Sequence, residues 1–549
     1  MVGGPVSRES SEASELGEAL ETLVHQFADP WSFLRELVQN SIDAGTPDIE
    51  VRIDHQADAD PGAPGMMIVE FVDAGGGMDR EIIDGRLTRL FSSAKDGDYT
   101  KIGRFGIGFV SIFAIEPELV CLDTGRNGEY WRVLFRADRS FERIVLDQPI
   151  EGTTIRMYKR QTAAQVEHAR ARARAVLEYW CKHARVEIRL DDALITQPMG
   201  IDGHCVITHE QEGTHVLVAY VDEREALRGY YHAGLTLHEE RDDRLAHVAF
   251  KIDSRFLEHT LTRDNVIRDE NFAKAMAIVG RLVRTDLVAE LVRACERAAI
   301  EPGGHDRDRH EFLRARLLEL IRGAGKLEVE IVERPLIPTI DGQPISLAEV
   351  RRHIKRCWCA SVASPVTELL RARGDRVLAC TPGSALHALV RAHARREPTP
   401  VASVCIATPA RPTERGPWER LRAALGLLLA AIDVKVGDIE LGHLAYPGSP
   451  VADHVAITQA RFGELTAVAE IGELSSGWFR SRRIVVFNAD HPTVAQLLEL
   501  APREAELAAY LALKLFFSST QLLRTQLDPT LDDTLARVAA NARWNRQTS

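Results

Sequence analysis

Three polar residues near the start of the chain have types and a spacing that could do chemistry. Glu36, Asn40 and Asp43 follow one another at i, i+4 and i+7, so a helix would carry all three on one face. Apolar residues recur at helical spacing through the surrounding segment, residues 31–45 (WSFLRELVQNSIDAG). This face is either a solvated helix surface or the part of a nucleotide site that presents a base and a metal ligand.

Three glycine-containing elements downstream favour the nucleotide site. Residues 73–78 (DAGGGM) end a predicted strand, residues 103–108 (GRFGIG) begin a predicted helix, and residues 152–153 begin a later strand. Glycines at a helix start let backbone N–H groups approach phosphate oxygens, and the helix dipole favours the negative charge. One such motif alone is more often a tight turn. The helix that carries Glu36 and the three glycine elements, in this order, together indicate a phosphate-binding pocket.

The hydrophobic pattern predicts the elements that would hold these residues. Asp29 and Pro30 suit the first turn of the helix that carries Glu36, and Gly45 is expected to end that helix. Residues 92–101 (SSAKDGDYTK) are polar and predict a loop. Together with these, we expect helices over 14–27, 78–91 and 103–113, and strands over 49–54, 66–72, 119–122, 131–135, 144–146 and 153–158. The result is an α+β domain.

The rest of the chain predicts an α/β middle domain and a mixed α/β C-terminal region. We expect helices over 161–183, 270–323, 349–396, 416–432 and from 493 onward, and strands over 186–190, 214–221, 246–252, 465–471 and 484–490. Domain boundaries are placed after residues 160 and 330, so the domains are 1–160, 161–330 and 331–549. The basic run at 168–179 (HARARARAVLEY) fits a solvated helix face better than an RNA-binding arm.

The composition is that of an ordinary globular protein. Of the 549 residues, 45 % are hydrophobic and 27 % are charged, and the net charge of -12 disfavours non-specific attraction to nucleic acid or anionic membranes. Residues 1–20 lack the apolar core of a signal peptide, and no apolar run is long enough to span a membrane. The eight cysteines show no zinc-ligand spacing, so we expect reduced thiols and a cytoplasmic protein.

The four elements together resemble a known family. Residues 36–44 (ELVQNSIDA), 73–78 (DAGGGM), 103–109 (GRFGIGF) and 152–155 (GTTI) resemble the N, G1, G2 and GT boxes of the GHKL ATPases. That superfamily includes DNA gyrase B, the heat-shock protein 90 chaperones, histidine kinases and MutL. The resemblance covers about residues 16–160 and is strongest to the heat-shock protein 90 (HtpG-like) family. It implies the Bergerat ATP-binding α/β sandwich, with ATP and Mg²⁺ as cofactors.

The resemblance implies a role for each matched residue on the catalytic and adenine sides of the pocket. Glu36 would be the general base for the attacking water, and Asn40 would be the Mg²⁺ ligand. Asp43 would lie on the ribose and phosphate side. Asp73 would accept a hydrogen bond from the adenine amino group. The remaining residues implied near adenine are Gly77, Met78 and Thr153.

Other implied contacts are to phosphate. Backbone amides of one glycine-rich segment would bind the β- and γ-phosphates, and its residues are Gly103, Arg104, Phe105, Gly106, Ile107 and Gly108. Lys95 is either a further phosphate ligand or a solvated surface lysine. Residues 254–272 resemble the catalytic loop of the chaperone middle domain, which makes Arg263 the candidate for the arginine that reaches the γ-phosphate. The alternative is a helix-start arginine paired with Asp264 or Asp269.

Two other segments bear on the domain plan. Residues 175–192 resemble the helix and strand that begin the chaperone middle domain, whereas nothing after about residue 330 resembles the chaperone dimerisation domain. Asp490 and His491 lie together between a predicted strand and a predicted helix. A metal or catalytic role is possible for such a pair, but a helix cap before Pro492 is the simpler interpretation.

We therefore expect a cytoplasmic, Mg²⁺-dependent ATPase that acts as a conformational switch. The leading hypothesis is a chaperone-like protein remodeller that forms an ATP-dependent homodimer, has no membrane partner and acts on a client protein or another macromolecule. The alternative is a nucleic-acid-linked ATP clamp similar to MutL, gyrase B or MORC proteins, in repair or defence. An inactive nucleotide-binding scaffold is disfavoured because Glu36, Asn40 and Asp73 are all present.

Overall fold

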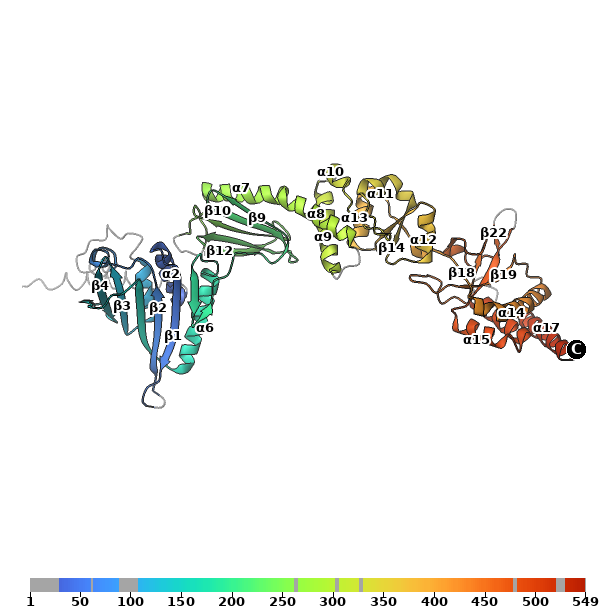
Figure 1. The fold of residues 1–549 in the computed structure, drawn as a ribbon, viewed down its shortest axis with the longest axis horizontal. Helices are drawn as coiled ribbons and strands as arrows, with labels where there is room; N and C mark the ends of the chain where they lie inside the picture. The colour runs from blue at the N-terminus through green and yellow to red at the C-terminus, as the bar shows by residue number, and fades with distance from the viewer. Residues whose placement is uncertain are drawn as a thin grey trace, which may run out of the picture. The chain divides into compact units, whose positions relative to one another are not determined.

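The chain folds into two compact units of mixed α/β structure, Met1–Val288 and Ala289–Ser549 (Figure 1). The computed structural model describes residues 29–60, 63–87, 107–260, 265–301, 306–324, 329–476, 481–519 and 529–548. The helix expected over 14–27 and the loop expected over 92–101 lie outside these ranges.

The first unit begins with an eight-stranded sheet of order β5-β4-β3-β6-β2-β1-β7-β8. Neighbouring strands are antiparallel except β7, which runs parallel to β1. The strands are β1 (Asp48–Gln56), β2 (Gly65–Asp73), β3 (Leu119–Arg126), β4 (Glu129–Arg136), β5 (Phe141–Val145), β6 (Thr153–Gln161), β7 (Glu187–Leu190) and β8 (Ala193–Leu194). The strands predicted for this part of the chain are thus confirmed.

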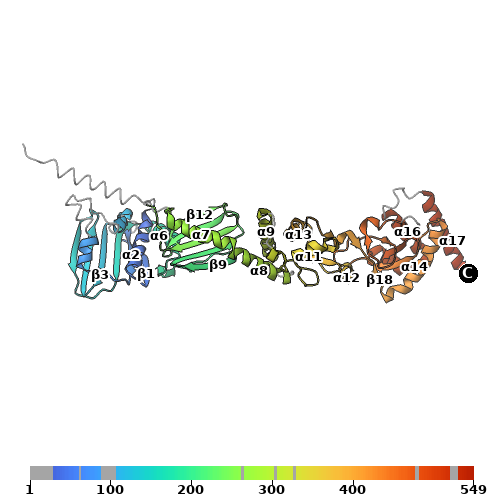
Figure 2. The same cartoon turned by 90° about the horizontal axis from the view of Figure 1, so that it is seen from above.

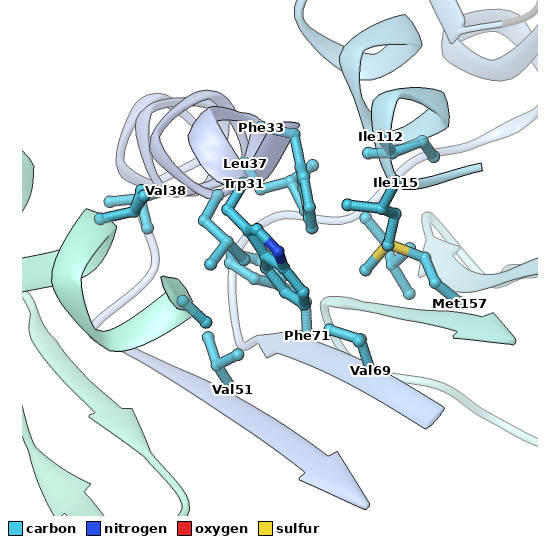
Figure 3. Packing of buried hydrophobic residues seen from close by; sticks show 14 of the residues in the cluster. Trp31, Phe33, Leu37, Val38, Val51, Val69, Phe71, Ile112, Ile115 and Met157 are labelled. Atoms are coloured by element: carbon cyan, nitrogen blue, oxygen red, sulfur yellow. The ribbon is translucent and has the colours of Figure 1, made fainter. Parts of the chain in front are cut away.

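A layer of helices packs on one face of this sheet. Its elements are η1 (Pro30–Ser32), α2 (Phe33–Asp43), α3 (Arg80–Ile82), η2 (Ile83–Leu87), α5 (Ile107–Val110), η4 (Ser111–Ile115) and α6 (Ala163–Trp180). Side chains alternate along β2, so Met67, Val69 and Phe71 are at most 1% exposed and face the helices. In Figure 3, Trp31 lies against Phe71 inside this core.

Helix α6 and strand β7 belong to the same core, and β8 pairs with β7 at the edge of the sheet, although the predicted boundary after residue 160 separates all three from it. Val166, Ala173 and Leu177 of α6 and Ile188 of β7 are all fully buried or nearly so in the cluster that contains α2. The segment that resembles the start of a chaperone middle domain therefore completes the N-terminal sheet. The apolar face of α6 and the buried residues of β7 explain this placement.

A second sheet follows in the first unit, with order β12-β11-β13-β10-β9. Helix α7 lies along one of its faces, against β10 and β13 (Figure 2). The elements are β9 (His204–Gln211), β10 (Thr214–Tyr220), β11 (Ala226–His232), β12 (Leu235–Asp242), β13 (Val248–Ser254) and α7 (Glu270–Arg284).

Polar and charged groups, buried or half-buried, join this sheet to the residues that follow α6. Lys182 contacts Glu239 of β12 at 2.8 Å, and Tyr231 of β11 donates a hydrogen bond to the same carboxylate. Lys251 of β13 lies 2.8 Å from Nε2 of His183, whose Nδ1 lies 3.2 Å from the carbonyl of Gln197. His183 therefore donates through Nδ1 and accepts the lysine proton at Nε2, so it is neutral.

The second unit contains two smaller sheets of more than two strands and many helices. Strand β14 pairs parallel with both β15 and β16, and the other sheet has order β18-β19-β24-β20. Its helices are α8 (Asp286–Ile300, which begins in the first unit), α9 (Arg307–Ala324), α10 (Val329–Val332), α11 (Leu347–His353), η5 (Ile354–Arg356), α12 (Pro365–Ala372), α13 (Ala385–Ala394), η6 (Val401–Ser403), α14 (Pro412–Ala431), η7 (Val468–Glu470), α15 (Pro492–Leu500), α16 (Ala505–Ser519) and α17 (Pro529–Thr548). Its strands are β14 (Cys357–Ala360), β15 (Arg376–Ala379), β16 (Thr399–Pro400), β17 (Val404–Cys405), β18 (Thr408–Pro409), β19 (Ile439–His443), β20 (Ala456–Gln459), β21 (Thr466–Ala467), β22 (Ser475–Ser476), β23 (Ser481–Arg482) and β24 (Ile484–Asn488).

Two predictions for this unit were wrong. Residues 349–396 are not continuously helical, because β14 and β15 interrupt them. Both strands are four residues long, and short buried parallel strands lack the alternation that distinguishes strand from helix. Residues 465–471 form only the two-residue strand β21 before η7 begins. The strand predicted over 484–490 is confirmed as β24.

Two properties concern the whole described chain. All eight cysteines are buried free thiols. Among the described residues, we find no helix that is both long and apolar enough to cross a membrane.

The neutral state of His183 predicts how the stability of the first unit depends on pH. Burial and the neighbouring Lys251 lower the pKa of His183 to about 4 from 6.5. Between these values the unfolded chain binds a proton that the folded chain excludes, so stability falls on acidification. From about pH 7 to about pH 5 this single group should remove about 2 kcal/mol.

Urea unfolding of the wild type and a His183→Gln variant at both pH values tests this. Glutamine can keep both hydrogen bonds but does not titrate, so the variant should lose less stability on acidification. His168→Gln, at an exposed position of α6, is the control and should behave as the wild type. Equal losses in wild type and His183→Gln would contradict the prediction.

Candidate functional site

Helix α2 carries the three polar residues at different depths. Asp29 begins the helical segment by accepting a hydrogen bond from the N–H of Trp31 at 2.9 Å, as predicted for a cap. Glu36 is only 4% exposed, whereas Asn40 and Asp43 are exposed. The face is therefore not simply a solvated surface, because it runs from a buried carboxylate to an exposed amide and carboxylate.

Asp73 lies at the end of β2, where it contacts α2. Its Oδ2 accepts a hydrogen bond from Ser41 at 2.9 Å, and its Oδ1 accepts one from the N–H of Gly75 at 2.9 Å. The side chain is 7% exposed, and burial raises its pKa against the opposing effect of these two donors. A carboxylate with few solvent contacts and spare lone pairs favours a further hydrogen-bond donor.

The ends of three strands meet beside Asp73. Thr153 of β6 pairs with Asp73 of β2 and with Thr124 of β3. The Thr124 hydroxyl donates to the carbonyl of Gly152 at 3.0 Å, lies 3.1 Å from the Thr153 hydroxyl and accepts the N–H of Met78 at 2.9 Å. The predicted residues Asp73, Met78 and Thr153 are thus brought together.

Two glycines at this meeting point cannot carry a side chain. A Cβ on Gly77 would lie 2.0 Å from the carbonyl oxygen of Gly125, and one on Gly152 would lie 2.0 Å from that of Asp73. Both glycines also have positive φ, 58° and 68°. Gly77 and Gly152 are therefore required by close backbone packing, apart from any nucleotide.

Asp43, near the C-terminal end of α2, lies within electrostatic range of one residue of the second sheet. Partial burial raises the pKa of Asp43, and the nearby charge of His232 in β11 acts in the opposite direction. The ring Nδ1 of His232 lies 2.8 Å from the carbonyl of Leu257, so this nitrogen carries a proton.

The sequence analysis did not predict four residues that support this region. Ser41, Thr46 and Thr124 hold the strand ends, with Thr46 accepting the N–H of Ala74 at 3.0 Å. Arg35 is buried with its guanidinium 4.3 Å from the ring of Trp180, and burial lowers its pKa to about 10. A serine on a helix or a threonine on a strand is too common to predict such a contact from the sequence. Arg35 gives a clearer signal, because a charged residue stands among the apolar residues of the helix.

Several predicted residues lie outside the described ranges: Lys95, Gly103, Arg104, Phe105, Gly106 and Arg263. Ile107 and Gly108 begin α5, the short helix expected after the second glycine element. On either side of residues 261–264, Thr260 N–H donates to Asn265 at 2.9 Å and Ile267 N–H donates to Glu258 at 2.8 Å.

Asp490 and His491 have structural roles in the second unit. Asp490 Oδ2 accepts N–H groups from Leu444 at 3.0 Å and Ala445 at 2.8 Å, while its Oδ1 lies 2.7 Å from His443 Nδ1. Burial raises the pKa of Asp490, but these donors outweigh it and the pKa is lowered. His491 accepts the N–H of Thr493 at the start of α15, so the helix-cap interpretation is confirmed.

The Gly152 contact predicts a matched pair of variants. Gly152→Ala adds both an unfavourable φ and a clash with Asp73, and should destabilise the unit by about 3 kcal/mol. Gly128→Ala has the same φ problem at 83° but no atom within 4 Å of its Cβ, so it should cost only about 1 kcal/mol. Urea unfolding gives the two values, and equal costs would show that the clash is relieved locally.

Comparison with known proteins agrees with this geometry. Residues 28–154 match the family model described as "Histidine kinase-, DNA gyrase B-, and HSP90-like ATPase". A search of curated proteins finds no match to the chain. The matched range contains α2 and the strand ends around Asp73, and it reaches Thr153. The N-terminal part of this mixed α/β chain therefore carries a GHKL-type ATPase domain.

Proposed function

We propose that the chain is a Mg²⁺-dependent ATPase whose nucleotide pocket lies between α2 and the ends of β2, β3 and β6. The observation that carries the proposal is the contact between Ser41 and Asp73, because it joins the helix bearing Glu36 to a buried carboxylate. The contact thereby fixes the position of the proposed general base, Glu36, relative to the proposed adenine-binding carboxylate, Asp73.

The described residues fit ATP at the adenine end. Asp73 keeps lone pairs beyond those used by Ser41 and Gly75, and a carboxylate accepts from an exocyclic amino group but repels a carbonyl. This chemistry selects adenine over guanine. Met78 and the glycines beside it would line the flat ring, and the glycines add no side chain that would obstruct it.

The phosphate end would be formed by α2 and the second glycine element. Asn40 is exposed one turn after Glu36, so its side-chain oxygen can reach a solvated Mg²⁺ that keeps some of its water. Asp43, also exposed, would lie on the ribose and phosphate side. Bound ATP and Mg²⁺ would supply the phosphoryl group and its charge neutralisation. Buried Glu36 would orient a water molecule and accept its proton.

The biological output of this ATPase is proposed as protein remodelling by an ATP-dependent homodimer in the cytoplasm. Arg263 would approach the γ-phosphate when the second sheet and the ATP site come together. Eight buried free thiols fit a reducing compartment. The client is a protein whose identity is left to experiment.

The alternative, a clamp on nucleic acid, is less well supported by the charge distribution. The arginines of the basic run in α6 are paired with acidic groups: Arg170 with Asp191, Arg172 with Asp29 and Arg174 with Glu178. Guanidinium groups that already contact carboxylates gain less from phosphate. The net charge of -12 acts in the same direction.

Substitution of Glu36 separates binding from turnover. Glu36→Ala should keep ATP binding but lower kcat by at least about 100-fold, because the general base is removed. Asp73→Asn should instead lose ATP affinity, measurable by calorimetry. Glu81→Ala, an exposed acid in the same domain, is the control and should retain both properties. Normal hydrolysis by Glu36→Ala would exclude it as the base.

The choice between the two functions is tested by what stimulates hydrolysis. ATP turnover should rise with an unfolded protein and remain unchanged with DNA or RNA at low and high salt. A salt-dependent rise with nucleic acid would overturn the remodeller in favour of the clamp. Proteins that co-purify with Glu36→Ala in the presence of ATP then identify the client.

A further inference from the structure

A cavity with a volume of about 650 Å³ lies among helices α9, α10, α11 and α13 of the second unit (Figure 1). Helix α13 packs against both α9 and α11, and α10 follows α9 in the chain. The volume is within the range of small-molecule sites, about 300–1,000 Å³. Since each side of the cavity comes from a different helix, the lining is formed only when this part of the chain folds.

Part of the cavity wall is apolar. Ala348 of α11 and Ala392 of α13 have small side chains, which leave the space between the helices open. Ile321 of α9 is 7% exposed and Val332 of α10 is half-buried, whereas Val329 of α10 is 77% exposed. Contact with an apolar molecule would remove this valine from water, so the wall favours a ligand with an apolar body.

Three arginines and one carboxylate complete most of the lining. Arg352 contacts Glu333 at 3.9 Å, and this ion pair is weak because both side chains are more than half exposed. Arg351 of α11 and Arg395 at the end of α13 form no ion pair with any residue that the structure describes. The lining therefore has three positive charges against one negative charge, and two guanidinium groups remain available for an anion.

His393 adds a hydrogen-bonding atom beside these arginines. Its ring Nε2 is shielded from solvent and has no hydrogen-bond partner among the described residues. Burial and the charge of Arg351 lower the pKa of His393, so the ring is neutral at pH 7. A shielded polar atom without a partner is unfavourable, and a ring with its hydrogen on Nε2 can donate to a carboxylate oxygen.

Another cavity of the same unit provides an internal comparison. It has a volume of about 370 Å³ and lies beside α12 and β15. Its arginines are already paired, Arg371 with Asp341 at 3.2 Å and Arg376 with Glu349 at 3.0 Å. Of the described residues that line it, only Ala372 is apolar. Unpaired guanidinium groups next to an apolar wall therefore distinguish the larger cavity.

We propose that the larger cavity is a binding site for a small amphipathic carboxylate, a molecule with one carboxylate head and an apolar chain. Arg351 and Arg395 bind the head, because a guanidinium donates two parallel hydrogen bonds to a carboxylate. The alanines, Ile321 and the valines of α10 cover the chain. Since Glu333 also lies in the lining, the single charge of a carboxylate fits better than the double charge of a phosphate. This inference does not depend on the proposed ATPase.

Isothermal titration calorimetry of the full chain, with decanoate as the probe, tests the proposal. We expect saturable binding of one decanoate per chain with a Kd below about 1 mM. Decanol lacks the charge and acetate lacks the chain, so each should bind at least about 10-fold more weakly. The absence of saturable decanoate binding would overturn the proposal, and so would equal binding by decanol or by acetate.

Two variants then test whether the probe lies in this cavity. Arg351→Gln removes one unpaired charge and should weaken decanoate binding about 10-fold. Ala348→Leu fills the space without changing the charge and should abolish binding. Arg396→Gln is the matched control, because Arg396 is exposed next to Arg395 but does not line the cavity.

The control should bind decanoate as the wild type does, and circular dichroism checks that each variant is folded. Unchanged affinity in folded Arg351→Gln and Ala348→Leu would place the probe elsewhere and contradict the proposal. An equal loss of affinity in Arg396→Gln and Arg351→Gln would reduce the effect to overall charge and overturn it as well.

Discussion

The hydrogen bond from Ser41 to Asp73 is the contact on which the N-terminal site depends. A buried carboxylate is costly unless it accepts hydrogen bonds, and here one comes from the helix and one from the turn after the strand. Because Glu36 lies on the same helix as Ser41, any shift of α2 along the sheet would both move Glu36 and break this hydrogen bond. The apolar packing of α2 supplies the stability, and this polar contact sets its position.

The sequence indicated where the pocket residues lie better than it indicated their supporting contacts. Glu36, Asp73 and Thr153 were selected because each lies in a short motif whose residue types and order are specific, and the fold brings Asp73 and Thr153 together. Ser41 and Thr124 were missed because a hydroxyl on a helix or strand is common, and only the fold brings it to a carboxylate or a backbone group. The spacing places Asn40 and Asp43 on one helix face with Glu36, but it does not reveal that these two are exposed while Glu36 is buried.

The same limit explains the errors in the second unit. Helix α14 is a long segment and strand β24 is an almost uninterrupted apolar run, so the sequence pattern predicted both. β14 and β15 consist of four residues each within a region of helical pattern, so their pairing is decided by tertiary contacts.

The parallel pairing of β7 with β1 has a consequence for how this domain can be isolated. β7 pairs with Asp48–Val51, and beyond it Asp191 accepts the N–H of Ile53 while Arg170 of α6 donates to the Ile53 carbonyl. A fragment ending at residue 160 would remove all of these partners. Strand β1 would then become a bare sheet edge, able to recruit another chain by strand addition, so the smallest well-behaved ATP-binding fragment must include the chain through Ile195.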